Sequence, residues 1–437
     1  MRKIMCVVVI QSFLICNISW ANLNQECLSP SMNVNSPGLM QVFLNNIADE
    51  NDLGETIVQV SQVFRNSRDL QWDVPIAANP NIIPGKQPAV VLIKPDGAVN
   101  AQAIKDEIAY WESQGYAVID LTLYKGKALQ AKKSVPRHYG VSTIAAQQGP
   151  EFILRSKAAQ QGLKEKFNVK IYDVYASGRI YGGLELSEMG YSLDAIDEAW
   201  VNSTKIASGV YCAKTKLKGG KLDGQEIFVI NGHVPRMIDY FENDVLDLQN
   251  GTTLNNVTIK FRIAPVREDA TPLAVMRDAH HLGKTQLEAA WAADQNSKRS
   301  QYYAKLKERG LLAVYEKFKS MVNGDHLSDS LLNAMRESVI WGHDLHEQPL
   351  TAMLFAEGFN WDDIVYLVEE GPVQILEAVE DAQLQTEMDV AEFLKDKFYT
   401  QIKEAVTAKK LARQTGDQPE LEPASGVFLG DRVEQAI

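Results

Sequence analysis

The chain has 437 residues, which exceeds the size that one hydrophobic core usually serves, so two or three domains are expected. Hydrophobic residues make up 45% of it and charged residues 23%, values that are typical of globular proteins. The formal net charge of −12 argues against a general nucleic-acid binder, because contacts to a phosphate backbone need a basic face. A small phosphorylated ligand held by a few local cations is still compatible with this charge.

The first 21 residues have the pattern of a secretory signal peptide. Arg2 and Lys3 precede an apolar stretch over 5–14, and small residues follow at Ser19 and Ala21. A buried N-terminal strand is the alternative interpretation. We therefore expect a secreted or periplasmic protein, or a cytoplasmic one if the signal is not processed.

No stable membrane span is predicted, because no other segment approaches 18 uninterrupted apolar residues and the N-terminal run is short. Signal cleavage would leave two cysteines, Cys27 and Cys212. The spacing leaves their pairing open.

Residues 22–86 are expected to form a helical arm followed by a linker. Ile57, Val60 and Phe64 recur at helical spacing, and several prolines between 75 and 88 then indicate an extended connection.

A compact α/β unit follows the linker. The apolar run 89–93 predicts a buried strand, and Gly97 belongs to the turn that ends it. Asn100 can cap a helix that ends at Gly115, and the alternation over 116–123 predicts a second strand.

The rest of the chain is expected to contain further helices and strands. Helical stretches are predicted near 150–166, 192–202 and 235–241, strands at 226–230, 257–263 and 272–276, and a hairpin turn at 216–221. From 286 to 412 the apolar pattern is almost wholly helical, which predicts a helical domain over 293–412. The composition of the tail, 413–437, predicts disorder.

The stretch Val90-Val91-Leu92-Ile93-Lys94-Pro95-Asp96-Gly97, with the helix and strand after it, resembles the opening of nucleoside diphosphate kinases. The resemblance covers residues 87–292, with an insertion at about 140–222. It implies a ferredoxin-like α/β (α+β) sheet, in which 226–230 would be the third strand. It also implies that Lys94 binds the phosphates of the nucleotide.

Other residues extend this resemblance in the same order along the chain. His138-Tyr139 matches a tyrosine that often follows the family's second strand, and Val234-Pro235-Arg236 matches a helix with a phosphate-binding arginine. Thr258-Ile259-Lys260 resembles Thr-Ile-Arg, with Lys260 or Arg262 as the cation. Arg277-Asp278-Ala279-His280-His281 resembles Arg-Asn-x-x-His, whose histidine is phosphorylated. The implied nucleotide- and phosphate-binding residues are Lys94, Tyr139, Arg236, Lys260, Arg262, Arg277 and Asp278, and the implied nucleophile is His281.

The last motif departs from the family pattern at three places. Asp278 replaces the asparagine, Leu282-Gly283-Lys284 replaces Gly-Ser-Asp, and no glutamate lies near Ala292, where one should orient the imidazole. Glu288 is about one helical turn too early.

The resemblance implies transfer of a γ-phosphate from a nucleoside triphosphate to a nucleoside diphosphate through phosphohistidine, with Mg²⁺ on the nucleotide. The alternative is a catalytically inactive, exported fold that binds nucleotides, phosphate or another protein. Whether the chain forms homo-oligomers is left open. His343 and His346, three residues apart, could instead share a metal ion on a helix, but no third ligand is identifiable and a solvated helix face explains them better.

Overall fold

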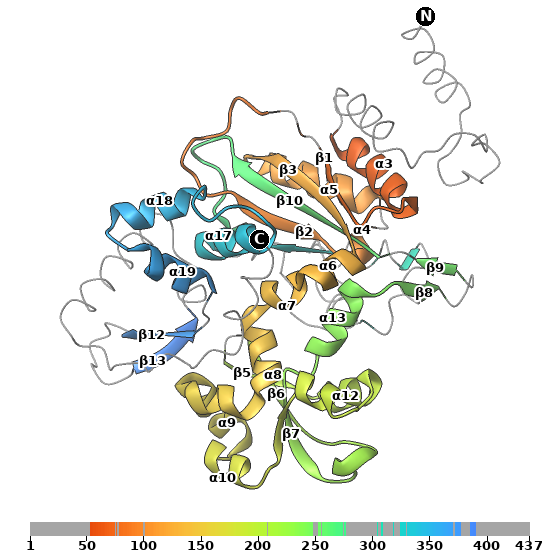
Figure 1. Ribbon diagram of the computed structural model, residues 1–437, viewed down its shortest axis with the longest axis vertical. Helices are drawn as coiled ribbons and strands as arrows, with labels where there is room; N and C mark the ends of the chain where they lie inside the picture. The colour runs from red at the N-terminus through yellow and green to blue at the C-terminus, as the bar shows by residue number, and fades with distance from the viewer. Residues whose placement is uncertain are drawn as a thin grey trace, which may run out of the picture. The chain divides into compact units, whose positions relative to one another are not determined.

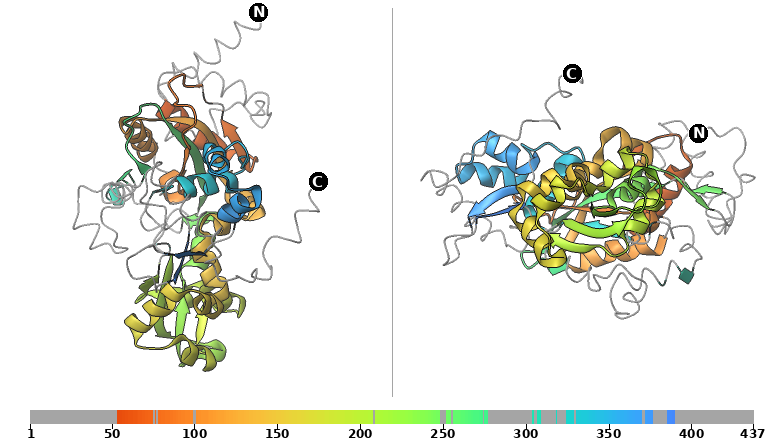
Figure 2. Two further views of the ribbon diagram at one scale, coloured as in Figure 1. Left: turned by 90° about the vertical axis from the view of Figure 1, so that its left-hand side faces the viewer. Right: turned by 90° about the horizontal axis from the view of Figure 1, so that it is seen from below.

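The computed structural model describes residues 53–276 apart from 75, 77, 99–100, 208, 248–251, 255 and 274, isolated positions between 304 and 318, and 324–328, 330–369, 372–376 and 385–389. These residues belong to one compact unit, Glu50–Ile437. They form a mixed α/β structure with antiparallel and parallel strand pairs (Figures 1 and 2). No helix among them is both long and apolar enough to cross a bilayer. The predicted signal peptide (1–21) and tail (413–437) lie outside the described residues.

Five strands form the larger sheet, in the order β1-β3-β10-β2-β11, and every neighbouring pair is antiparallel. Their bounds are β1 Gln71–Val74, β2 Ala89–Ile93, β3 Tyr116–Lys125, β10 Val257–Pro265 and β11 Asp325–Leu327. The strands predicted at 89–93, 116–123 and 257–263 are confirmed. β1 and β11 were not predicted, because four and three residues are too few to show a strand period.

Helices cover both faces of this sheet. On one face α3 (Leu53–Asn66) and α5 (Ala101–Ser113), both predicted, pack against β3. The apolar side chains on the other face, which include Val90 and Leu92, join the core formed by α6 (Gly126–Lys132), α7 (Ser134–His138) and α13 (Val234–Glu242). Helix α17 (Leu331–Ile340) also contacts β2.

A second sheet of four strands lies in the insertion between β3 and β10, in the order β4-β7-β6-β5. Its strands are β4 Ile180–Gly182, β5 Thr204–Ala207, β6 Val210–Lys216 and β7 Glu226–Ile230. The helices around it are α8 Gly140–Arg155, α9 Lys157–Phe167, α10 Ile171–Ala176, α11 Gly183–Glu188 and α12 Leu193–Trp200. Antiparallel β6 and β7 flank the predicted hairpin, which holds the 3-10 turn Gly220–Leu222.

The assignment of 226–230 to the same sheet as 89–93 is wrong. β7 pairs with β4 and β6, whereas β10 occupies the place beside β2. An apolar run of five residues predicts a buried strand but carries no information about which sheet receives it.

The C-terminal part is not wholly helical in the described residues. Besides α17 it contains α18 (Pro349–Ala356) and α19 (Trp361–Glu369), but it also supplies β11 to the large sheet and a hairpin of β12 (Pro372–Leu376) and β13 (Gln385–Asp389). The strand predicted at 272–276 is also wrong, because residues 273, 275 and 276 are helical. The remaining short elements are α4 Pro95–Ala98, β8 Val245–Asp247 and β9 Thr252–Leu254.

Candidate active site

One row of side chains crosses the large sheet on the face covered by α7, α13 and α17. His326 of β11 lies opposite Leu92, Leu92 lies opposite Lys260, and Lys260 lies opposite Thr122. Residues paired in this way project to the same face. Two strand spacings place His326 and Lys260 about 10 Å apart on that face.

The Lys94-Pro95-Asp96-Gly97 turn fixes the start of β11. The Lys94 amide donates to the Gly324 carbonyl at 2.8 Å, and the Gly324 amide donates to Asp96 Oδ2 at 3.0 Å. Asp96 is fully buried, and its other carboxylate oxygen accepts from the Tyr240 hydroxyl. A Cβ on Gly97 would lie 2.4 Å from the Gly324 carbonyl oxygen, so only glycine fits here. This turn therefore holds the start of β11, which carries His326, beside the end of β2, which Lys94 follows.

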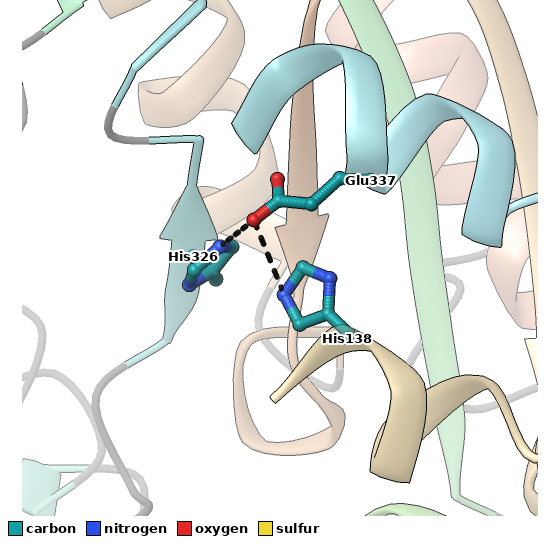
Figure 3. A group of neighbouring side chains, drawn as sticks. All are labelled: His138, His326 and Glu337. Carbon is teal, nitrogen blue, oxygen red and sulfur yellow. Dashed lines mark hydrogen bonds and ion pairs between the residues drawn. The ribbon is translucent and has the colours of Figure 1, made fainter. Parts of the chain in front are cut away.

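His326 meets a buried carboxylate from helix α17. Glu337 Oε1 lies 3.1 Å from His326 Nε2 and 3.9 Å from Nε2 of His138, at the end of α7 (Figure 3). An ionised carboxylate only accepts, so in that form Glu337 accepts the His326 Nε2–H. The second oxygen, Oε2, accepts from the Ser328 hydroxyl at 2.5 Å, and the Val90 amide donates to the same hydroxyl at 2.9 Å. Glu337 is thus contacted at both carboxylate oxygens by the β11 segment, through His326 and through Ser328 just after the strand.

The electrostatics of Glu337 are a balance between burial and its donors. Burial holds the pKa of its carboxyl above the usual range, and His138, the Ser328 hydroxyl and Arg336 oppose part of that rise. Whether Glu337 is ionised therefore depends on the three groups that lower its pKa, His138, Ser328 and Arg336.

His138 and His326 differ in their access to solvent. The His138 side chain is 1% exposed and that of His326 is 23% exposed. Burial lowers the pKa of His138 to about 3, so this imidazole is neutral near pH 7. Of the two rings, only that of His326 can be reached by a substrate from solvent.

Trp341 determines the tautomer of His138. The indole Nε1–H donates to His138 Nδ1 at 3.3 Å, and an indole nitrogen can only donate. The neutral His138 ring therefore carries its proton on Nε2, the atom that faces Glu337. That N–H has no hydrogen-bond partner among the described residues.

The three side chains could in principle hold a metal ion, since one ligand atom of each lies within 4.8 Å of the others. However, a histidine bound to a metal through Nε2 donates with Nδ1, whereas Nδ1 of His138 accepts from Trp341. The hydrogen bonds thus suit an imidazole–carboxylate–imidazole arrangement better than a metal centre.

Two residues predicted from the sequence lie around this cluster. The Tyr139 ring contacts the rings of His138 and His326, with centroid distances of 4.8 and 5.9 Å. Lys94 is close enough that its charge contributes to the lowered pKa of His138. Lys94 belongs to the predicted turn 94–97, and Tyr139 to the predicted His138-Tyr139 segment.

The other predicted cations make ion pairs. Arg236 contacts Asp197 at 2.7 Å, Asp194 and, at 3.5 Å, Asp239, so it faces helix α12. Lys260 and Arg262 share Asp120, at 2.7 and 2.5 Å. Arg277, Asp278 and His281 lie outside the described residues.

His343 and His346 do not come together. His343 Nε2 lies 3.0 Å from Lys260 Nζ, whereas the His346 ring stacks on Trp361 at 3.8 Å. The two imidazoles therefore do not form a shared metal site, because the His343 ring contacts Lys260 and the His346 ring contacts Trp361.

His326, Ser328 and Glu337 were not singled out from the sequence, although a signal for them existed. Val322-Asn323-x-x-His326-Leu327-Ser328-Asp329 fits Arg-Asn-x-x-His-Gly-Ser-Asp at every specified position but two, and Glu337 lies eleven residues after His326. That spacing is the one expected between the nucleophile and its glutamate in the resembling family, from His281 to Ala292. The segment 277–281 precedes this one along the chain and carries the arginine and histidine of the same pattern.

Searches of protein-family models, of curated proteins and of solved structures find no match to this chain.

Proposed function

We propose that the protein is a nucleoside-diphosphate-kinase-like phosphotransferase in which His326 is the phosphorylated residue. The observation that carries this proposal is the 3.1 Å contact between His326 Nε2 and the buried Glu337 carboxylate. A histidine can accept a phosphoryl group on one ring nitrogen when the other is oriented by an acceptor. The phosphoryl group would therefore be carried on Nδ1.

The sequence around His326 supports the same proposal. Asn323, Ser328, Asp329 and Glu337 stand at the positions that the family pattern requires, with Val322 in place of its arginine and Leu327 in place of its glycine. His281 lacks the asparagine, the Gly-Ser-Asp and the glutamate, and remains the weaker candidate.

The strand order offers independent support. β2, β3, β10 and β11 follow one another along the chain and lie in the order β3-β10-β2-β11, all antiparallel. A ferredoxin-like sheet has its four strands in this arrangement, with a helix after the first strand, as α5 is here. We propose that the insertion between β3 and β10 interrupts such a sheet.

In this proposal Lys94 and Tyr139 help to position the Mg²⁺-bound nucleotide, since both lie beside the imidazole pair. Arg236, Lys260 and Arg262 would act mainly in the ion pairs they already form. Fewer cations then face the phosphates than the resemblance implies.

The competing proposal is an inactive fold that binds a nucleotide or another protein. The ion pairs of those three cations favour it, because a triphosphate needs positive groups that are not already neutralised.

Phosphate transfer from ATP to GDP separates the two proposals. Wild type, His326→Asn and His281→Asn would be assayed with Mg²⁺, and their folding checked by thermal melting. Loss of at least about 10³-fold in His326→Asn alone is expected for the active enzyme. A folded wild type that forms no GTP, or an equal loss in His281→Asn alone, would contradict the assignment of His326.

A further inference from the structure

Glu337 has a second imidazole neighbour that the reaction does not obviously need. The rings of His138 and His326 lie edge to face with centroids 4.4 Å apart, and both Nε2 atoms face Glu337 Oε1 (Figure 3). His326 is within hydrogen-bond distance at 3.1 Å, and His138 at 3.9 Å is not. His138 cannot be the nucleophile, because its side chain is almost completely buried.

The His138 ring is nevertheless oriented toward the carboxylate. Its Nδ1 accepts from Trp341 Nε1–H, which leaves the proton on Nε2, and the Tyr139 ring lies nearly perpendicular to it at a centroid distance of 4.8 Å. A buried N–H without a partner is unfavourable, so it is rarely kept without a role. Here the N–H points toward the one acceptor that also orients His326.

We propose that His138 is a positioning residue that acts through Glu337: its Nε2–H keeps the carboxylate ionised and turned toward His326. This inference rests on the proposed phosphotransfer by His326. His138 touches neither the nucleotide nor the reacting atoms in this account.

The charge of Glu337 matters because of the chemistry of the step. The lone pair of His326 Nδ1 attacks the γ-phosphorus, the P–N bond forms, and the bond to the bridging oxygen breaks with its electrons leaving on the nucleoside diphosphate. No proton moves, and the ring becomes a phosphoimidazolium that keeps its Nε2–H. An ionised Glu337 stabilises this cation, whereas a protonated one would not.

Several other groups bear on the same carboxylate. Arg336 lies on its own helix, Ser328 and His326 on the β11 segment, and the charge of Lys94 reaches His138 from the end of β2. Arg336 and Ser328 also favour the ionised form of Glu337. His138 is the neighbour whose buried N–H has no hydrogen-bond partner within the described residues.

The test compares His138→Phe, which keeps the ring shape, with His138→Gln, which restores a side-chain donor. For each variant kcat and KM for ATP would be measured from pH 5 to 9, with Glu337→Gln as the reference for complete loss of the carboxylate. The pKa of Glu337 would be followed by ¹³C NMR of carboxyl-labelled protein, a readout that requires no turnover.

We expect His138→Phe to lower kcat about tenfold with KM within twofold, and to move the acidic limb of the profile and the pKa of Glu337 up by about one pH unit. His138→Gln should recover most of the lost kcat and most of the shift in pKa.

Equal effects in the two variants would mean that His138 only fills space, and an unmoved Glu337 pKa would overturn the inference. Stoichiometric Zn²⁺ binding lost in His138→Phe would overturn it too, in favour of a metal site. An inert wild type would refute the proposed function, while the Glu337 titration would still decide whether His138 acts on the carboxylate.

Discussion

At the scale of the residue, the partner of a charged side chain indicates its role better than its type does. Arg236 was expected to bind phosphate, yet its guanidinium contacts carboxylates of α12 and α13 and is 8% exposed. Burial raises the pKa of Asp197, and Arg236 opposes this rise. The arginine thus stabilises the packing of two helices of the insertion.

Replacing Arg236 with methionine should therefore affect stability more than catalysis. We expect a loss of about 2 kcal/mol in the free energy of unfolding, because Asp197 keeps its burial without its partner. The KM for ATP should stay within twofold of wild type. Urea unfolding and steady-state kinetics check this, with Arg179→Met, an exposed arginine of the same insertion, as control. A tenfold rise in KM at unchanged stability would instead restore the phosphate-binding role.

The candidate site could be predicted only in part at this scale. Lys94 and Tyr139 were found because each belongs to a local motif, and both lie beside His138 in space. His326 also stands in a local motif, but the histidine motif at 277–281 comes first along the chain, and β11, with three residues, shows no strand period that marks His326. Glu337 was missed together with His326, because its sequence signal is the spacing from His326 and not its own neighbours in the chain.

At the scale of the element, the turn after β2 holds two strands together. Gly324 is bound through its carbonyl to the Lys94 amide and through its amide to Asp96. The turn that resembled a phosphate-binding motif thus also has a structural function. It sets the register of the short strand that carries His326.

A methyl group at Gly97 should disturb this junction. Gly97→Ala would bring a Cβ to 2.4 Å from the Gly324 carbonyl oxygen and 2.8 Å from the Ile93 side chain, so we expect a loss of about 1–3 kcal/mol in stability. The transfer rate should fall as well, since β11 must shift. Gly140→Ala is the matched control, because its nearest contact would be an ordinary 3.5 Å. Similar melting temperatures and rates for the two variants would contradict the structural role of the turn.

At the scale of the whole molecule, local patterns predicted the elements better than their assembly. α3, β2, α5, β3, α13 and β10 follow from periodicity and turn residues. The insertion could not be divided correctly, because pairing between strands distant in sequence leaves no local signal. β7 was therefore placed in the wrong sheet, and β11 was absorbed into a stretch with helical spacing.

The fold also buries histidines, which should make its stability depend on pH. His233 lies between β7 and α13, against the rings of Trp200 and Tyr211, and burial alone lowers its pKa from 6.5 to about 4. Because the folded pKa is the lower one, the unfolded chain binds the proton first as pH falls below 6.5. The stabilisation is complete above that pH and is lost as pH falls toward 4.

His233→Phe should remove this contribution. Between pH 7 and pH 5 the wild type should lose about 2 kcal/mol of unfolding free energy more than the variant does. Urea titrations at both pH values measure the difference, and data above pH 7 fix the constant effect of the substitution. Parallel losses in the two proteins would show that His233 is not kept neutral by burial.

The central claim is that His326, held by Glu337, carries the phosphoryl group. Its most direct test is to locate the label after reaction with ATP and Mg²⁺ at alkaline pH, by mass spectrometry of the phosphopeptides and ³¹P NMR. The account predicts phosphate on His326, at Nδ1, and none on His281. Phosphate on His281, or none on a folded protein that binds ATP, would contradict it.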